Sequence, residues 1–168
     1  MNEVYTIRSK EGDEYKLQFT TNRSGVIANV ILDRLESQGV FVVEIGLERT
    51  KGLNSTNHRV LAQIEQCIAD VMLRNPNVML TFFCDFISML PSMKKDISVQ
   101  EYRSRLFSRM FERYVTQHQI VDVFNRVTIV EGVAENYYFH IIARKHHLVF
   151  ADMISEGIQK DFGKPTEE

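Results

Sequence analysis

One apolar segment, residues 78–84 (VMLTFFC), constrains the fold of this chain more than any other. It has almost no polar positions, whereas a strand with one face in water alternates apolar and polar residues. Its length and composition therefore predict a strand in the middle of a sheet, covered on both faces. The rest of the chain is expected to pack around this strand.

A helix is predicted to follow over residues 98–114. Ser98 and Glu101 have the spacing of a capping box, which satisfies backbone N–H groups at the start of a helix. At about 100° per residue, the apolar residues of this segment form one arc, and Arg103 projects near its middle. Because a lone buried charge is costly, Arg103 is expected to pair with Asp85, at the end of the apolar strand.

Three further arginines, Arg105, Arg109 and Arg113, follow one another at i, i+4 on the opposite side of this helix. Like charges at this spacing repel by a few tenths of a kcal/mol per pair, so acids or a bound anion nearby would favour the row. Asp85, Arg103, Arg105 and Arg109 are therefore candidate ligand-binding residues for a phosphate or carboxylate. The competing interpretation is that Asp85 and Arg103 form a structural ion pair.

The N-terminal part of the chain predicts a four-stranded meander. Residues 4–8, 14–20 and 40–48 alternate apolar and polar side chains at least in part. Residues 26–36 fit either a strand or a helix capped by Ser24. Their β-branched content and their place between turn signals favour a strand.

Residues 57–74 repeat apolar side chains every three and four positions, which predicts an amphipathic helix that lies on the sheet. Residues 85–96 predict either a packed loop or a lid, and the pattern leaves both open. Strands are expected over residues 120–132 and 137–144, and a last helix over 148–162.

Together these segments predict a single α+β domain over residues 1–168. Its sheet is expected to be mostly antiparallel, with about seven strands in the element order β-β-β-β-α-β-α-β-β-α. Three helices are expected to pack mainly on one face of this sheet.

Three motifs in order, FCDF, RSRLFSRMF and NYYFHIIARKHH, resemble a family of small uncharacterised proteins from Bacteroidetes. In that family a strand ends in a Cys-Asp step, an Arg-x-Arg-x-Phe helix follows, and a late strand leads into the last helix. The chain departs from the family at Phe86 to Leu90, where the family has a polar, acid-containing segment. The resemblance implies a bacterial protein and this fold, but no activity. The matching residues are Cys84, Asp85, Arg103, Arg105, Phe107, Arg109, Phe111 and Tyr138.

Composition excludes several classes of function. The formal net charge of -2 gives no overall attraction to nucleic acid or to an anionic membrane. No run of about 18 apolar residues predicts a membrane span, and the N-terminus does not have the pattern of a secretory signal. The expected location is therefore the cytoplasm, where Cys67 and Cys84 would be reduced core thiols.

The sequence holds few signs of catalysis. It has no glycine-rich nucleotide loop and no Gly-x-Ser-x-Gly motif, and His140, His146 and His147 do not have the spacing of metal ligands. We predict no catalytic residue, no metal and no cofactor. An RNA-binding role could use the outer arginines with Tyr137 and Tyr138, but the acidic balance argues against nucleic acid.

Two functions therefore remain. The first is a non-enzymatic interaction or regulatory module that meets a protein partner, or a second copy of itself, through a sheet face or edge. The alternative is a small-anion or nucleotide-type ligand binder or enzyme, built on Asp85, Arg103, Arg105 and Arg109.

Overall fold

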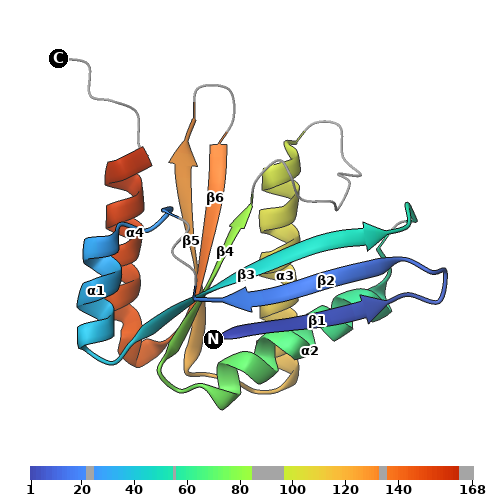
Figure 1. Cartoon of the computed structure of the whole chain (residues 1–168), viewed down its shortest axis with the longest axis horizontal. Helices are drawn as coiled ribbons and strands as arrows, with labels where there is room; N and C mark the ends of the chain where they lie inside the picture. The colour runs from blue at the N-terminus through green and yellow to red at the C-terminus, as the bar shows by residue number, and fades with distance from the viewer. Residues whose placement is uncertain (22–24, 55, 85–96, 133–135, 163–168) are drawn as a thin grey trace.

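The structure is a computed structural model, and it describes residues 1–21, 25–54, 56–84, 97–132 and 136–162 (Figure 1). The described residues contain six strands and four α-helices, and a 3-10 turn, Lys145–His147, precedes the last helix. In chain order the elements are β1 (Asn2–Arg8), β2 (Glu14–Thr20), α1 (Asn29–Ser37), β3 (Phe41–Lys51), α2 (His58–Arg74), β4 (Val78–Cys84), α3 (Val99–Gln117), β5 (Val123–Glu131), β6 (Asn136–Arg144) and α4 (Leu148–Phe162).

The six strands form one mixed sheet with the order β1-β2-β3-β4-β6-β5. All neighbouring pairs are antiparallel except β3 and β4, in which Phe41 lies opposite Val78. Parallel strands need a long crossover connection, and α2 supplies it. The α+β class and the mostly antiparallel sheet are thus confirmed, whereas the expected number of about seven strands is one too high.

The error lies in residues 26–36, which were predicted as a strand and instead form most of α1. Ile31 and Leu35 are spaced by four residues, so the helix places them on one face, and Ile27, just before the helix, is buried as well. Leu35 has no exposed surface, whereas Val30 is 74% exposed. Ser24, the predicted cap, lies outside the described residues.

Helix α1 packs closely against α4. A Cβ atom at Gly157 would lie only 2.4 Å from Cδ1 of Ile31. The missing side chain at this position of α4 therefore lets Ile31 approach the helix backbone. Long-range packing of this kind outweighs the β propensity of the segment.

The helices cover both faces of the sheet, which corrects the prediction of three helices mainly on one face. Figure 1 shows α1 and α4 on one side of the sheet and α2 and α3 on the other. The neighbouring residues Met79 and Leu80 of β4 point to opposite faces, and both are fully buried. The apolar strand at residues 78–84 is thus covered on both faces, as predicted.

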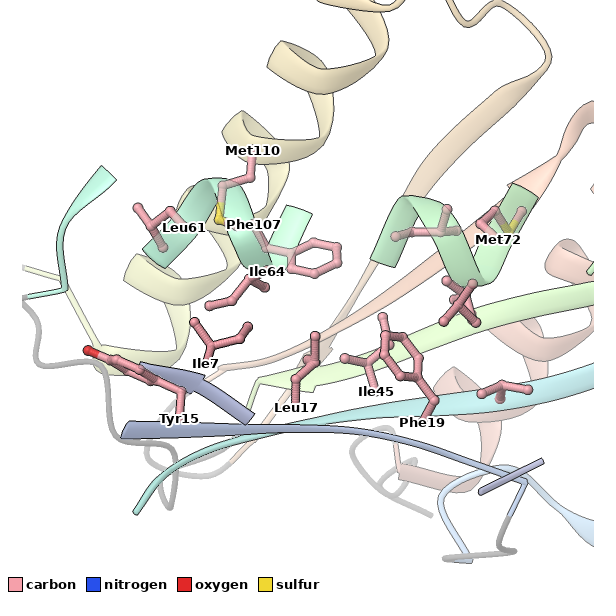
Figure 2. Close-up of a cluster of buried hydrophobic side chains, with 14 of the residues drawn as sticks. Ile7, Tyr15, Leu17, Phe19, Ile45, Leu61, Ile64, Met72, Phe107 and Met110 are labelled. Carbon is pink, nitrogen blue, oxygen red and sulfur yellow. The ribbon is translucent and has the colours of Figure 1, made fainter. Parts of the chain in front are cut away.

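Each face of the sheet has its own hydrophobic core. Figure 2 shows the larger core, in which Leu17 and Ile45 of the sheet face Ile64 of α2 and Phe107 of α3. The second core lies under α1 and α4. Its fully or almost fully buried members include Leu35, Met79, Phe139, Ile141 and Ile154.

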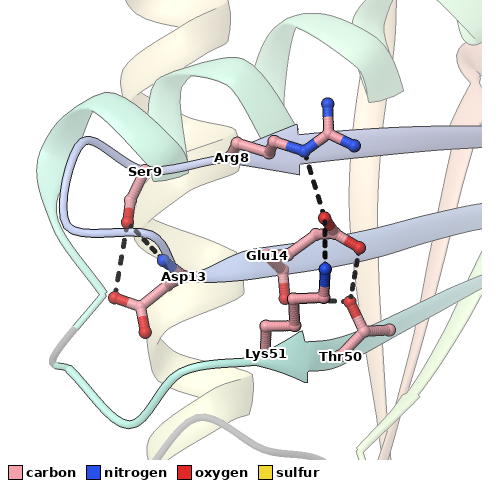
Figure 3. Close-up of polar contacts among 6 residues, drawn as sticks. All are labelled: Arg8, Ser9, Asp13, Glu14, Thr50 and Lys51. Atoms are coloured by element: carbon pink, nitrogen blue, oxygen red, sulfur yellow. Dashed lines mark hydrogen bonds and ion pairs between the residues drawn. The ribbon is translucent and has the colours of Figure 1, made fainter.

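Polar contacts tie the first hairpin to β3 (Figure 3). In the predicted turn, the backbone N–H of Asp13 donates to Ser9 Oγ at 3.0 Å. Glu14 then accepts from Arg8 Nε at 3.0 Å and from Thr50 Oγ1 at 3.1 Å. Because Arg8 belongs to β1 and Thr50 to β3, one carboxylate links three strands at their ends.

A buried arginine on β6 caps the C-terminal end of the crossover helix α2. Arg144 donates from Nη2 to the carbonyl of Met72 at 2.5 Å and from Nη1 to the carbonyl of Asn75 at 3.1 Å. The last carbonyls of a helix lack partners within the helix and carry partial negative charge. The guanidinium of Arg144 therefore fixes the C-terminal end of α2 against the sheet.

The helical packing of α1 predicts unequal effects of two apolar truncations. Leu35→Ala should lower the free energy of unfolding by about 2 to 4 kcal/mol, because it removes a fully buried side chain. Val30→Ala should change it by less than about 0.5 kcal/mol, because Val30 is exposed. Urea unfolding followed by circular dichroism measures both, and equal losses would contradict the helical packing.

Candidate functional site

The inner face of α3 carries the charged feature that the sequence predicts. Ser98 caps this helix, and its Oγ accepts from the backbone N–H of Glu101 at 3.1 Å. Arg103 is 3% exposed, which confirms that a cation points into the core. Its side chain lines a cavity of about 30 Å³, together with Phe82 and Leu106 among others.

The other predicted arginines lie on the outside of α3. Arg105 is exposed and donates to Glu101 at 2.7 Å, as an i, i+4 pair. Arg109 is exposed as well. The structure therefore does not bring Arg105 and Arg109 together with Arg103, because the helix directs them to different sides.

Asp85, the predicted partner of Arg103, lies outside the described residues, as does the whole predicted loop or lid over residues 85–96. The ion pair between Asp85 and Arg103 thus stays a prediction. The neighbouring Cys84, at the end of β4, has no exposed surface. Burial and the charge of Glu101 raise the pKa of Tyr138, which faces Cys84 across the strand pair.

A chain of polar side chains connects the inner face of α3 with the sheet. Ser104 Oγ lies 2.8 Å from Nε2 of His140 on β6. The other ring nitrogen of His140, Nδ1, lies 3.0 Å from Oδ1 of Asn125 on β5. Asn125 in turn donates from Nδ2 to Ser108 Oγ, one helical turn after Ser104, at 3.4 Å. These hydrogen bonds thus connect α3 with β6, β6 with β5, and β5 with the next turn of α3.

The hydrogen bonds fix the tautomer of His140. Since the Oδ1 atom of Asn125 can only accept, Nδ1 carries the proton and Nε2 accepts from the Ser104 hydroxyl. Burial lowers the pKa of His140 to about 4, so the imidazole is neutral near pH 7. Phe82 and Phe107 surround the ring, with centroids 6.3 and 4.9 Å from its own.

Ser104, His140 and Asn125 are hydrogen-bonded in the same way as the nucleophile, the base and the orienting group of a catalytic triad. Burial argues against that role, because His140 has no exposed surface and Ser104 is only 5% exposed. A substrate in solution therefore has no access to the hydroxyl. We interpret the chain as a polar lock that holds α3 on β5 and β6.

Ser104, Asn125 and this role of His140 were not predicted from the sequence. A usable signal was present in β6, where His140 stands between Tyr138 and Ile142 on the face turned to α3. A histidine at an inward position of a buried strand needs hydrogen-bond partners. The identity of those partners depends on how α3 crosses the sheet.

The edge strand β5 has an exposed apolar face. β5 is the last strand of the sheet, and α4 clamps one of its faces through an ion pair between Arg126 and Asp152 and a 2.6 Å contact between Thr128 and Ser155. On the other face Val127 is 39% exposed, and the next residue on that face, Ile129, is 48% exposed. Within the described residues, this face of the edge strand is thus apolar and accessible.

The described part of the chain gives no sign of a metal site or a membrane segment. No group of three or more histidine, cysteine or acidic residues among these residues is arranged to hold a metal ion. None of their helices has both the length and the apolar content to cross a bilayer. Neither Cys67 nor Cys84 forms a disulfide, and Cys67 is half-buried.

Comparison with known proteins adds no family: no family model matches the sequence, and no curated protein matches it. The resemblance to the Bacteroidetes family therefore stays a prediction. Any function must be argued from the structure of this chain.

Substitutions on α3 test the buried cation. Arg103→Ala should lower the free energy of unfolding by about 2 to 4 kcal/mol, and Asp85→Ala should have the same effect if the two groups pair. Arg105→Ala, the matched control, should cost less than about 0.5 kcal/mol because an exposed i, i+4 pair contributes little. Denaturant midpoints measure all three, and an unchanged midpoint for Arg103→Ala would refute the buried-charge interpretation.

The polar lock predicts a loss of stability in acid. The pKa of His140 is about 4 in the folded protein, against 6.5 for an ordinary histidine, so the unfolded chain binds this proton first. The loss of unfolding free energy through His140 is absent well above pH 6.5, grows as the pH falls, and is complete below pH 4. From pH 7 to pH 5 the protein should lose about 2 kcal/mol through this group.

His140→Gln isolates this contribution, because glutamine keeps hydrogen-bonding capacity and does not titrate. Urea unfolding of both proteins between pH 7 and pH 5 should give a shallower pH dependence for the variant. Parallel curves for the two proteins would show that His140 does not titrate as a buried neutral group.

Proposed function

We propose that this protein is a non-enzymatic interaction module that pairs with a second copy of itself through the edge of β5. The observation that carries the proposal is the exposure of Val127 and Ile129 on an edge strand. Proteins usually protect such edges with charged side chains, proline or a covering segment, because an open edge is a template for another strand. The middle of β5, Val127 to Val130, has no charged residue or proline.

The opposite edge of the sheet is better protected, which is why we choose β5. Arg74 of α2 reaches β1 and donates to Glu3 at 3.1 Å and to the hydroxyl of Tyr5 at 3.1 Å. A charged side chain from a neighbouring helix thus lies along β1. On β5 the charge of Arg126 is engaged by Asp152 on the α4 face, away from the exposed valine and isoleucine.

The side-chain pattern of β5 suits an antiparallel pair with two-fold symmetry. Directly opposed residues of antiparallel strands point to the same face of the sheet. If two β5 strands pair around Thr128, Val127 of each copy lies opposite Ile129 of the other. Four β-branched side chains then cover one another, and the contacts of α4 hold both strands ready for pairing.

The alternative function, a small-anion or nucleotide-type binder or enzyme built on Asp85, Arg103, Arg105 and Arg109, has less support. Arg103 is buried while Arg105 and Arg109 are exposed. A phosphate clamp requires donors that converge on one point. The hydrogen-bonded serine and histidine are buried, so they add little to the case for catalysis.

A charge placed on the edge tests the proposal. Val127→Lys should weaken self-association at least about tenfold, because each lysine would place a charge opposite Ile129 of the other copy in place of an apolar contact. Val4→Lys is the matched control, since Val4 is 50% exposed on the other edge strand and should leave association unchanged. Sedimentation equilibrium measures both affinities, and circular dichroism checks the fold.

Two results would contradict the proposal. The first is a wild-type protein that stays monomeric at about 100 μM chain, well above the dissociation constant of a micromolar complex. The second is a dimer that Val127→Lys leaves intact, which would place the contact elsewhere.

A further inference from the structure

A second surface feature, independent of β5 pairing, lies between α2 and α3. Both helices lie on the same side of the sheet (Figure 1), and a pocket of about 60 Å³ opens between them. Its walls are almost entirely apolar and include Ile68 and Ala69 from α2, Phe111 and Tyr114 from α3, and Ile142 from the sheet. Leu73, which is 55% exposed, also lines the pocket.

The lining favours hydrocarbon over water. A buried water needs about 10–15 Å³ of cavity volume and two to four polar partners. The pocket has the volume for several waters, yet among the described residues Glu65 is its only charged lining residue. Water in this pocket would therefore lack partners, whereas an aliphatic chain would gain dispersion contacts with the walls.

Charge at the mouth of the pocket indicates the head group of the ligand. Glu65 of α2 is bound by Nη2 of Arg113 from α3, so an ion pair spans the two helices beside the pocket. A guanidinium has five N–H donors, and the Arg113 side chain is 41% exposed, so it can bind a second carboxylate. Arg113 is therefore the cation beside this pocket, whereas Arg109, one turn earlier, projects from the side of α3 opposite the lining residues.

We propose that this pocket binds the aliphatic chain of a small carboxylic acid, with the carboxylate at Arg113. The ligand class follows from the two halves of the site, an apolar cleft and a cation at its rim. Arg113, one of the outer arginines of α3, thereby acquires a role that does not require it to converge with Arg103. Neither part of this inference depends on the β5 edge.

The experiment uses decanoate as the probe, with acetate and decanol as partial probes that have only the head group or only the chain. Methyl NMR of the isoleucine-labelled protein should show shifts at Ile68, Ile120 and Ile142, which line the pocket. Ile154, in the core on the other side of the sheet, should not shift. We expect decanoate to bind with a Kd below about 1 mM.

Two pairs of variants separate the chain from the head group. Ala69→Phe fills the pocket and should weaken decanoate and decanol binding about tenfold, whereas Ala62→Phe, at an exposed position of the same helix, should leave both unchanged. Arg113→Gln should weaken decanoate binding about threefold or more and leave decanol binding unchanged, and Arg105→Gln is its control.

The proposal is overturned if decanoate does not shift the pocket methyls, or if acetate shifts them equally. It is also overturned if Ala69→Phe binds decanoate like the wild type, or if Arg113→Gln has no effect on decanoate binding. The NMR map of the wild-type protein remains decisive even if Ala69→Phe fails to fold.

Discussion

Burial of β4 and β6 on both faces is the constraint on which the rest of this structure depends. Thr81 and the three residues before it are all buried, as are the last six residues of β6. Two adjacent strands without a solvent-exposed face require helices on both sides of the sheet. The pairs α2 with α3 and α1 with α4 meet this requirement, and their hydrophobic cores meet only through the sheet.

This central pair also sets the position of the polar groups. His140 stands on β6 in the face that α3 covers, so its ring must find partners within the protein. Ser104 and Asn125 provide them, and the resulting chain fixes the rotation of α3 on the sheet. Arg144, two positions beyond Ile142 on the same strand face, does the same for the end of α2. A well-satisfied polar group inside a core favours one packing arrangement over its alternatives.

Within the described residues the polar groups of the interior are buried, and the features that we propose for binding lie at the surface. On β5, α3 contacts Asn125 through Ser108, and within the described residues the next two side chains on that strand face, Val127 and Ile129, are exposed. The apolar pocket lies between α2 and α3, and Phe111 and Tyr114 are among its lining residues. Both features depend on where the helices lie, because they cover the centre of the sheet more completely than its edge.

Much of the fold was predictable because local patterns determine it. The helix spacing over residues 57–74, the cap at Ser98 and the doubly apolar strand each depend on neighbours in the sequence, and the structure confirms all three. Residues 26–36 are different, because their β-branched content favours a strand while contact with α4 at Gly157 stabilises a helix. The burial of Arg103 was also predictable, since its position in the helical arc depends only on spacing.

Local sequence patterns were enough to predict the class of fold, the central strand, three of the four helices in the described residues and the inward direction of Arg103. These depend on periodicity and capping, which act over a few residues. Three features could not be predicted in this way: helices cover both faces, β3 and β4 run parallel, and Ser104, His140 and Asn125 share a hydrogen-bonded chain. Such arrangements depend on contacts between residues far apart in the chain, whose distances no local pattern specifies.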